Sequence, residues 1–169
     1  MRGVTDLLIN SAKAAASGDR QRYRDARSTL VTRHRDAAEA LIPDLDDLAS
    51  IQELTDERIR EFERLCMAVA ILGELTGRGL AVISGLGERL MAPLLAAALR
   101  AKGLKAEFVD AGELIVTDDV HLSGDPQMDA TRAKTRARLL PLLERSVTPV
   151  VTGFVAATAD GVPTVWTSS

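Results

Sequence analysis

The sequence is poor in cysteine and in aromatic residues. Its single cysteine, Cys66, cannot build a disulfide framework within the chain, which fits a reducing, cytoplasmic setting. Cys66 lies inside an apolar run, so we expect it to pack in the core rather than to act as a nucleophile. Aromatic residues account for 3% of the chain, and the core must therefore be built from leucine, alanine, valine and isoleucine.

Other absences argue against whole classes of function. The net charge is −3 and no basic stripe is interleaved with aromatic residues, which speaks against a nucleic-acid partner. The longest unbroken apolar run, 65–72, is shorter than the roughly 20 residues that span a membrane, and the N-terminus has no hydrophobic signal core. The chain also lacks metal-ligand spacing and a phosphate-binding loop of the GxxxxGK type. We therefore expect a cytoplasmic protein with no membrane, metal or nucleic-acid partner.

What is present suits one domain of the α/β class. Hydrophobic residues make up 46% of the 169 residues and charged residues 27%, which is enough apolar material for a core. Residues 1–79 are mainly helical in pattern, whereas strands alternate with helices through 80–169. Such alternation predicts a mostly parallel sheet covered by helices. The expected strands are 80–83, 105–109, 114–117, 149–152 and 163–166.

Start and stop signals divide the helical half. Thr5 is expected to cap the first helix, and Pro43 ends a long amphipathic helix over 20–42. A short helix and a turn follow. Thr55 is then expected to cap another helix, which runs to about Thr76 and is buried in its apolar second half.

The glycine-containing stretch 84–88 is the first candidate site. We expect it to be a turn between the strand 80–83 and a following helix, with Glu88 near the helix N-terminus. Glu88 then either binds a cationic group or only stabilises the helix end, and the spacing leaves both open. The same glycines are a broken dinucleotide fingerprint, which keeps an NAD-binding domain as a distant alternative.

Three further positions carry chemical interest. Thr5 can present a hydroxyl and free helix amides to an anion, or it can serve only as a cap. Gly153 and Phe154 follow an apolar strand, at the sheet edge where open α/β sheets bind ligands. His34 lies on the apolar stripe of its helix, and we interpret it as a packing residue because the sequence places no partner acid or cysteine near it.

Taken together, these stretches resemble the catalytic domain of aspartokinases, within the amino acid kinase superfamily. The resemblance covers about residues 3–164, and its motifs occur in the family's order. They are Gly3-Val4-Thr5-Asp6-Leu7-Leu8, Gly85-Leu86-Gly87-Glu88-Arg89-Leu90, Val109-Asp110-Ala111, Ile115-Val116-Thr117-Asp118, Pro149-Val150-Val151-Thr152-Gly153-Phe154 and Asp160-Gly161.

This resemblance implies an α/β/α sandwich and a phosphotransferase reaction. In that reaction ATP phosphorylates the side-chain carboxylate of aspartate, the first step of lysine, threonine and methionine biosynthesis. Carried over to this chain, Thr5 and Glu88 would hold the aspartate, Glu88 by its amino group, and Gly153 and Phe154 would lie beside it.

This sequence departs from the family in the segments that serve the nucleotide half of the domain. The family's Lys-Phe-Gly-Gly-Thr-Ser and Gly-Arg-Gly-Gly-Ser-Asp segments have no counterpart in residues 1–169. We therefore expect a partial domain, truncated at both ends, that holds the aspartate lobe and no catalytic residue or cofactor. ATP and Mg²⁺ are implied only for a complete family member.

Two expectations about partners follow. A lobe of this kind is expected to be inactive by itself and to need a separate ATP-binding half. The alternative is a non-catalytic binding or self-associating protein that kept the fold. Open sheet edges favour a homo-oligomer in either case.

Overall fold

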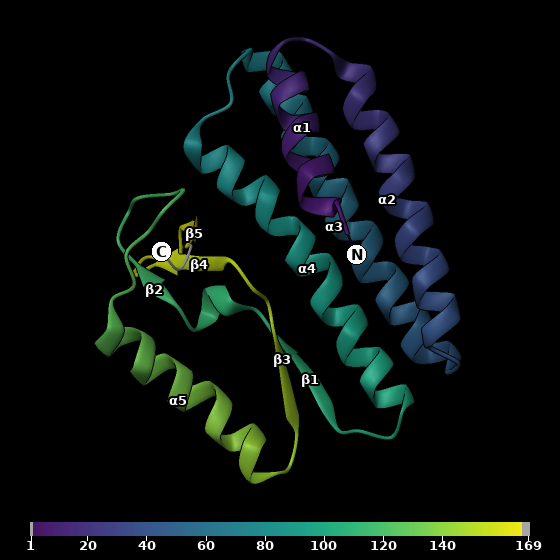
Figure 1. The fold of residues 1–169 in the computed structure, drawn as a ribbon, viewed down its shortest axis with the longest axis vertical. Helices are drawn as coiled ribbons and strands as arrows, with labels where there is room; N and C mark the ends of the chain where they lie inside the picture. Colours follow the sequence, from purple (N-terminus) through teal and green to yellow (C-terminus); the bar gives the residue numbers. More distant parts are fainter. Residues whose placement is uncertain (1, 167–169) are drawn as a thin grey trace.

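Four long helices occupy the first 101 residues of the chain (Figure 1). The computed structural model describes residues 2–166. The helices are α1 (Val4–Ala16), α2 (Arg20–Leu41), α3 (Leu45–Leu72) and α4 (Gly77–Ala101). The helix expected over 20–42 is confirmed as α2: Asp19 caps it by accepting a hydrogen bond from the amide of Arg22, and it ends at Leu41, shortly before Pro43.

The strands follow in the second half. They are β1 (Ala106–Val109), β2 (Val116–Thr117), β3 (Thr148–Val151), β4 (Val155–Thr158) and β5 (Pro163–Val165), with a short 3-10 turn η1 (Ala111–Glu113) and helix α5 (Met128–Glu144) between them. β1 pairs with β3 and β2 with β4, both in parallel. β4 and β5 form an antiparallel hairpin around Gly161, whose φ of 80° suits glycine. The strand pairing is thus mostly parallel, as the sequence predicts.

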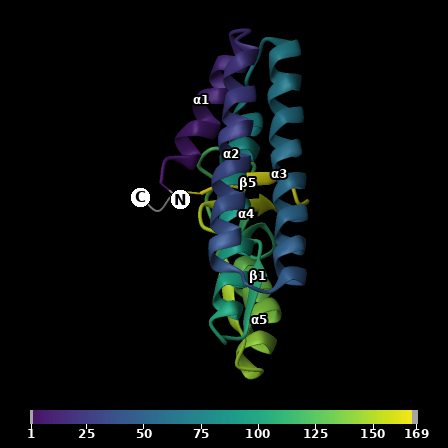
Figure 2. The same ribbon diagram turned by 90° about the vertical axis from the view of Figure 1, so that its right-hand side faces the viewer.

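The elements stack as an α/β/α sandwich, as expected. Ala106 and Val109 of β1 point to opposite faces because side chains alternate along a strand. Ala106 packs with Ala92 and Ala96 of α4, whereas Val109 packs with Leu142 of α5. The other helices, α1 to α3, lie on the far side of α4 from the strands (Figure 1), and α2 and α3 stand in front when the molecule is seen from their side (Figure 2).

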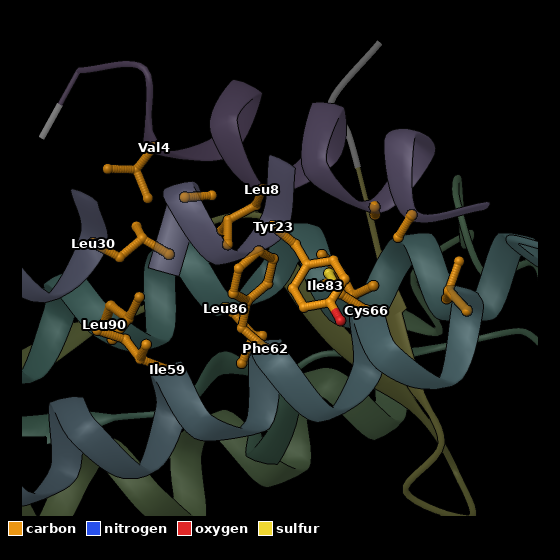
Figure 3. Packing of buried hydrophobic residues seen from close by; sticks show 14 residues of the cluster. Val4, Leu8, Tyr23, Leu30, Ile59, Phe62, Cys66, Ile83, Leu86 and Leu90 are labelled. Carbon is orange, nitrogen blue, oxygen red and sulfur yellow. The ribbon is translucent and has the colours of Figure 1, made fainter. Parts of the chain in front are cut away.

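The main core lies between the four long helices (Figure 3). Leu8, Leu30, Phe62, Ile83 and Leu86 come from α1, α2, α3 and α4 and are all completely buried. Each helix contributes an apolar stripe of period three to four, which is how amphipathic helices close a core. Cys66 belongs to the same cluster. Burial raises the pKa of the Cys66 thiol to about 12, so it packs as an apolar side chain, as expected.

The expected strand at 80–83 and the glycine turn after it are wrong. Residues 77–101 form one helix, capped by the Thr76 hydroxyl, which accepts a hydrogen bond from the amide of Gly79. A four-residue apolar run does not by itself distinguish a strand from a buried helix. Here α4 is covered on both sides, by helices and by strands, and tertiary packing outweighs the low helix propensity of Gly85 and Gly87.

The glycines of α4 let its neighbours approach closely. A Cβ at Gly85 would lie 3.3 Å from a methyl group of Val155 in β4. A Cβ at Gly87 would lie 3.5 Å from Leu8 of α1. The two glycines therefore shape the contact of α4 with strands on one side and with α1 on the other, rather than forming a turn.

The expected helix break before Thr55 is also wrong. α3 is one helix whose first turn is capped by Asp44, which accepts hydrogen bonds from the amides of Asp46 and Asp47. Its apolar second half is buried on one face only. Met67, Ile71 and Leu72 are 48%, 69% and 77% exposed.

Replacing Asp44 with alanine should lower the free energy of unfolding by about 1 kcal/mol, because two amides lose their acceptor. Thr55→Ala is the matched control. Thr55 lies in the middle of α3, where alanine is the better helix former, so its replacement should be neutral or slightly stabilising. Urea unfolding followed by circular dichroism measures both. A larger loss in Thr55→Ala than in Asp44→Ala would contradict the single helix.

α4 is also the one helix among residues 2–166 whose length and composition would suit a membrane span. Inside the protein, 67% of its most apolar window is buried. Its apolar character is explained by its place at the centre of the fold.

Candidate functional site

Glu88 and Gly153, which are 65 positions apart in the chain, meet in the structure. Glu88 lies in the middle of α4, not near a helix N-terminus, and is half-buried. Its Oε2 accepts a hydrogen bond of 3.1 Å from the amide of Gly153, two residues after the end of β3. A Cβ at position 153 would lie 3.4 Å from the same oxygen, so glycine lets the carboxylate come close to the strand end.

Thr5 reaches the same place from α1. It is not the cap that the sequence suggests: Gly3, with a φ of 78°, is the N-cap residue, and no side chain caps this helix. Thr5 is instead the second residue of α1 and is exposed. Its hydroxyl would lie 3.6 Å from a Cβ at Gly87, the neighbour of Glu88. The hydroxyl is therefore available to a ligand rather than committed to a helix end.

Thr5 and Glu88 line the same small pocket, which has a volume of about 50 Å³. The lining residues come from α1, α2 and α4, and they are Val4, Thr5, His34, Gly87, Glu88 and Met91. They include a carboxylate, a hydroxyl and an imidazole, and none of them is a lysine or an arginine. A pocket rich in hydrogen-bond acceptors and free of cationic side chains suits a ligand with a positively charged, donor-rich group such as an ammonium.

Phe154 follows Gly153 in the chain and does not line the pocket. Its φ is 63°, and the amide of Val155 donates a 2.6 Å hydrogen bond to the carbonyl of Gly153. This three-residue γ-turn with a positive φ is rare for a residue other than glycine. Such backbone strain is often found where a ligand is held. The structure thus brings Thr5 and Glu88 together in one pocket and joins Gly153 to Glu88 by a hydrogen bond, whereas Phe154 is the chain neighbour of Gly153 and does not line the pocket.

The cation nearest to Glu88 in sequence is already paired. Arg89 donates to Asp110 at 2.7 Å, with both side chains largely buried, and so ties α4 to the end of β1. Asp110 also accepts a hydrogen bond from the amide of Gly112. Arg89 therefore does not neutralise Glu88. Because Asp110 is the acid that an NAD ribose would require here, its ion pair speaks against the dinucleotide alternative.

His34 lines the pocket, although the sequence predicts only a packing residue at this position. It is 2% exposed, which confirms that it packs within the helical layer, yet it also lines the pocket. Its Nδ1 lies 2.8 Å from the carbonyl of Leu30. Within residues 2–166 its Nε2 is buried and has no hydrogen-bond partner. The available signal was an ionisable residue on an otherwise apolar helix stripe.

Lowering the pH should destabilise the protein through His34. Burial lowers the pKa of His34 from its ordinary value of 6.5, and the positive charges of the N-terminal amine and Arg33 lower it further, although the bond to Leu30 opposes this. The unfolded chain then takes up a proton here more readily than the folded chain. The stability that neutral His34 contributes is present above pH 6.5 and is lost as the pH falls through the lower folded pKa.

Urea unfolding at about pH 7.5 and about pH 5 measures this effect. We expect a smaller loss of stability on acidification in His34→Gln than in the wild-type chain, because glutamine does not titrate. Carboxylates that titrate elsewhere contribute equally to both proteins. An identical loss in the two would contradict a titrating role for His34.

Among the described residues, no group of three or more histidine, cysteine, aspartate or glutamate side chains is arranged to hold a metal ion.

Comparison with known proteins places this geometry in context. Residues 2–168 match the family model described as the amino acid kinase family. Over 166 residues the chain is 29% identical to the bifunctional aspartokinase/homoserine dehydrogenase 1, chloroplastic, of Arabidopsis thaliana, covering 97% of this chain and 18% of that protein. It is 28% identical to an aspartokinase of Schizosaccharomyces pombe, covering 94% of this chain and 30% of that one. The chain thus spans less than a third of these relatives.

Solved structures share the fold. Escherichia coli aspartokinase III in complex with aspartate and ADP superimposes with a TM-score of 0.79 at 20% identity, covering 98% of this chain and 35% of that one. The same enzyme with lysine and aspartate gives a TM-score of 0.77 at 18% identity, again covering 98% and 35%. At these identities the likeness establishes the fold alone.

Proposed function

Since the chain belongs to the amino acid kinase family, we propose that residues 1–169 form the aspartate-binding part of an aspartokinase-like enzyme. The reaction of aspartokinases is the ATP-dependent phosphorylation of the aspartate side-chain carboxylate, which begins the synthesis of lysine, threonine and methionine. One observation carries the proposal: Glu88 lies in a pocket without a lysine or arginine and is held against the amide of Gly153. The aspartokinases among the relatives support it.

Each candidate residue has a role in this proposal. The Glu88 carboxylate binds the ammonium group of aspartate, and the charge on both partners makes such a hydrogen bond stronger than a neutral one. The Thr5 hydroxyl binds from the side of α1. Gly153 and Phe154 form the strained wall beside the ligand, where the bond from Gly153 holds the carboxylate in place.

The nucleotide is proposed to bind elsewhere. Transfer of a phosphoryl group depends on positive charge around its oxygens, from lysine, arginine or Mg²⁺. The lining residues of the pocket supply none, and the described residues hold no cluster fit for a metal. We therefore propose that residues 1–169 by themselves bind aspartate without using ATP, and that ATP and Mg²⁺ require a further ATP-binding part. The reducing cytoplasmic setting expected from the single thiol belongs to the same proposal.

Calorimetry with purified residues 1–169 tests the binding step. We expect aspartate to bind and succinate, which lacks the ammonium group, to bind more weakly. A coupled assay for ADP formation tests the second step and should show no turnover dependent on both ATP and aspartate. Absence of aspartate binding would refute the proposed function. Turnover in the coupled assay would refute the need for a further part.

Self-association is a second candidate, and the C-terminal half of α3 favours it. Met67, Ile71 and Leu72 form an exposed apolar group on one side of the molecule. Burying such a group against a second copy would remove apolar surface from water. Light scattering on the wild-type chain and on Ile71→Glu tests this. A monomer in both cases would exclude it.

A further inference from the structure

We propose that His34 is a ligand-binding residue, whose Nε2 accepts a hydrogen bond from the ammonium group of the bound amino acid. The inference rests on the proposed function, because it adds a third contact to the ammonium site that Glu88 and Thr5 form. His34 comes from α2, so the site would be shared by α1, α2 and α4.

The backbone bond of His34 decides which ring nitrogen faces a ligand as an acceptor. A carbonyl oxygen can only accept, so the 2.8 Å contact with Leu30 requires the proton to be on Nδ1. In a neutral imidazole the other nitrogen, Nε2, then carries a free lone pair. Burial favours this neutral form, since it lowers the pKa of His34. The structure thus presents an acceptor and not a donor.

The lone pair on Nε2 of His34 accepts no hydrogen bond from any described residue. The atom is buried and unpartnered within residues 2–166. Buried polar atoms in native proteins nearly always have a partner, and an exception calls for a ligand or a bound water. A leucine would fill the same place in the helical layer without this cost. The pocket it lines with Thr5 and Glu88 offers a place from which a donor can reach it.

The number of acceptors matches an ammonium group. An α-ammonium, like that of lysine, carries three N–H donors and no acceptor. Three residues that line the pocket can each supply one acceptor: Glu88 a carboxylate oxygen, Thr5 its hydroxyl and His34 its Nε2. Glu88 is the charged group that lines this pocket. Arg35 of α2 and Asp56 of α3 line a separate small hollow on which His34 also borders. A protonated His34 would repel the ligand, so the neutral form is the one that binds.

Two substitutions distinguish the contributions of the two ring nitrogens of His34. His34→Asn keeps a donor near the position of Nδ1, for Leu30, and removes Nε2. His34→Gln keeps a polar atom near the position of Nε2. Tyr23→Phe is the control, because Tyr23 is also buried on α2 but lines a different hollow. Circular dichroism verifies that each variant is folded.

The measurement is the affinity of each variant for aspartate and for succinate, by calorimetry. We expect His34→Asn to weaken aspartate binding by about 10-fold to 100-fold, the usual effect of losing a hydrogen bond to a charged group. Its affinity for succinate should stay unchanged, because succinate has no ammonium to contact. His34→Gln should recover part of the loss, and Tyr23→Phe should bind both ligands as the wild type does.

The outcomes distinguish this inference from the proposed function. If the wild type binds aspartate and His34→Asn binds it equally well, the inference fails and the proposed function stands. Equal losses for aspartate and succinate would also overturn it, because they would indicate a structural defect. If the wild type does not bind aspartate, both fail. Should His34→Asn not fold, nitrogen NMR of the wild-type ring decides: Nε2 must shift with aspartate but not with succinate.

Discussion

Replacing Glu88 with glutamine should weaken aspartate binding by about 100-fold or more. Glutamine has nearly the same shape and keeps a carbonyl oxygen that can accept the hydrogen bond from Gly153. The fold should therefore be preserved while the negative charge is lost. Removing one partner of a half-buried charge pair typically costs about 2–5 kcal/mol, because the remaining charge loses its compensation. Calorimetry with aspartate measures the effect directly.

Glu144→Gln is the control for this experiment. Glu144 is exposed at the end of α5, so its replacement changes the net charge by the same amount without reaching the pocket. It should bind aspartate as the wild type does. If both variants lose affinity equally, the effect is one of overall charge. If Glu88→Gln binds normally, Glu88 serves only to hold the end of β3, which is a structural role.

Replacing Phe62 with alanine should lower the free energy of unfolding by about 3–5 kcal/mol. Phe62 is completely buried in the cluster between α1, α2, α3 and α4 (Figure 3). Removing its ring leaves a cavity in a layer of packed helices that cannot collapse without moving. Since small domains are stable by about 5–15 kcal/mol in total, the variant should unfold at much lower urea concentration.

Phe108→Ala provides the comparison for Phe62. Phe108 lies on β1 and is only half-buried, so the same chemical change should cost clearly less. Urea unfolding followed by circular dichroism reports both. If the two variants lose equal stability, the helical cluster is not the principal core of the protein.

Local patterns were sufficient for much of the fold. The stripe of Tyr23, Leu30 and His34 predicts α2 almost to its ends, because helical periodicity is a property of the sequence alone. The strands β1, β3 and β5 follow from short apolar runs between turn residues, whereas β4 was not among the expected strands. Parallel pairing follows from their alternation with helices.

Local patterns were insufficient where an element is covered on every side. In the stretch 80–88, an apolar run followed by glycines suggests a strand and a turn, yet it is the middle of α4. Packing against α1 and β4 accounts for both the glycines and the helix. Thr55 likewise has the pattern of a helix cap but lies inside α3, because Asp44 starts that helix earlier.

By itself, the sequence determined the family, the α/β class and the identity of Glu88 as the acid of interest, since motifs and periodicity are read along the chain. Only the tertiary structure decided that Glu88 projects from the middle of a helix to the amide of Gly153. It also decided that Thr5 and His34 line the same pocket. The physical reason is that this pocket forms where three helices and a strand end meet, and no local pattern records which distant segments pack together.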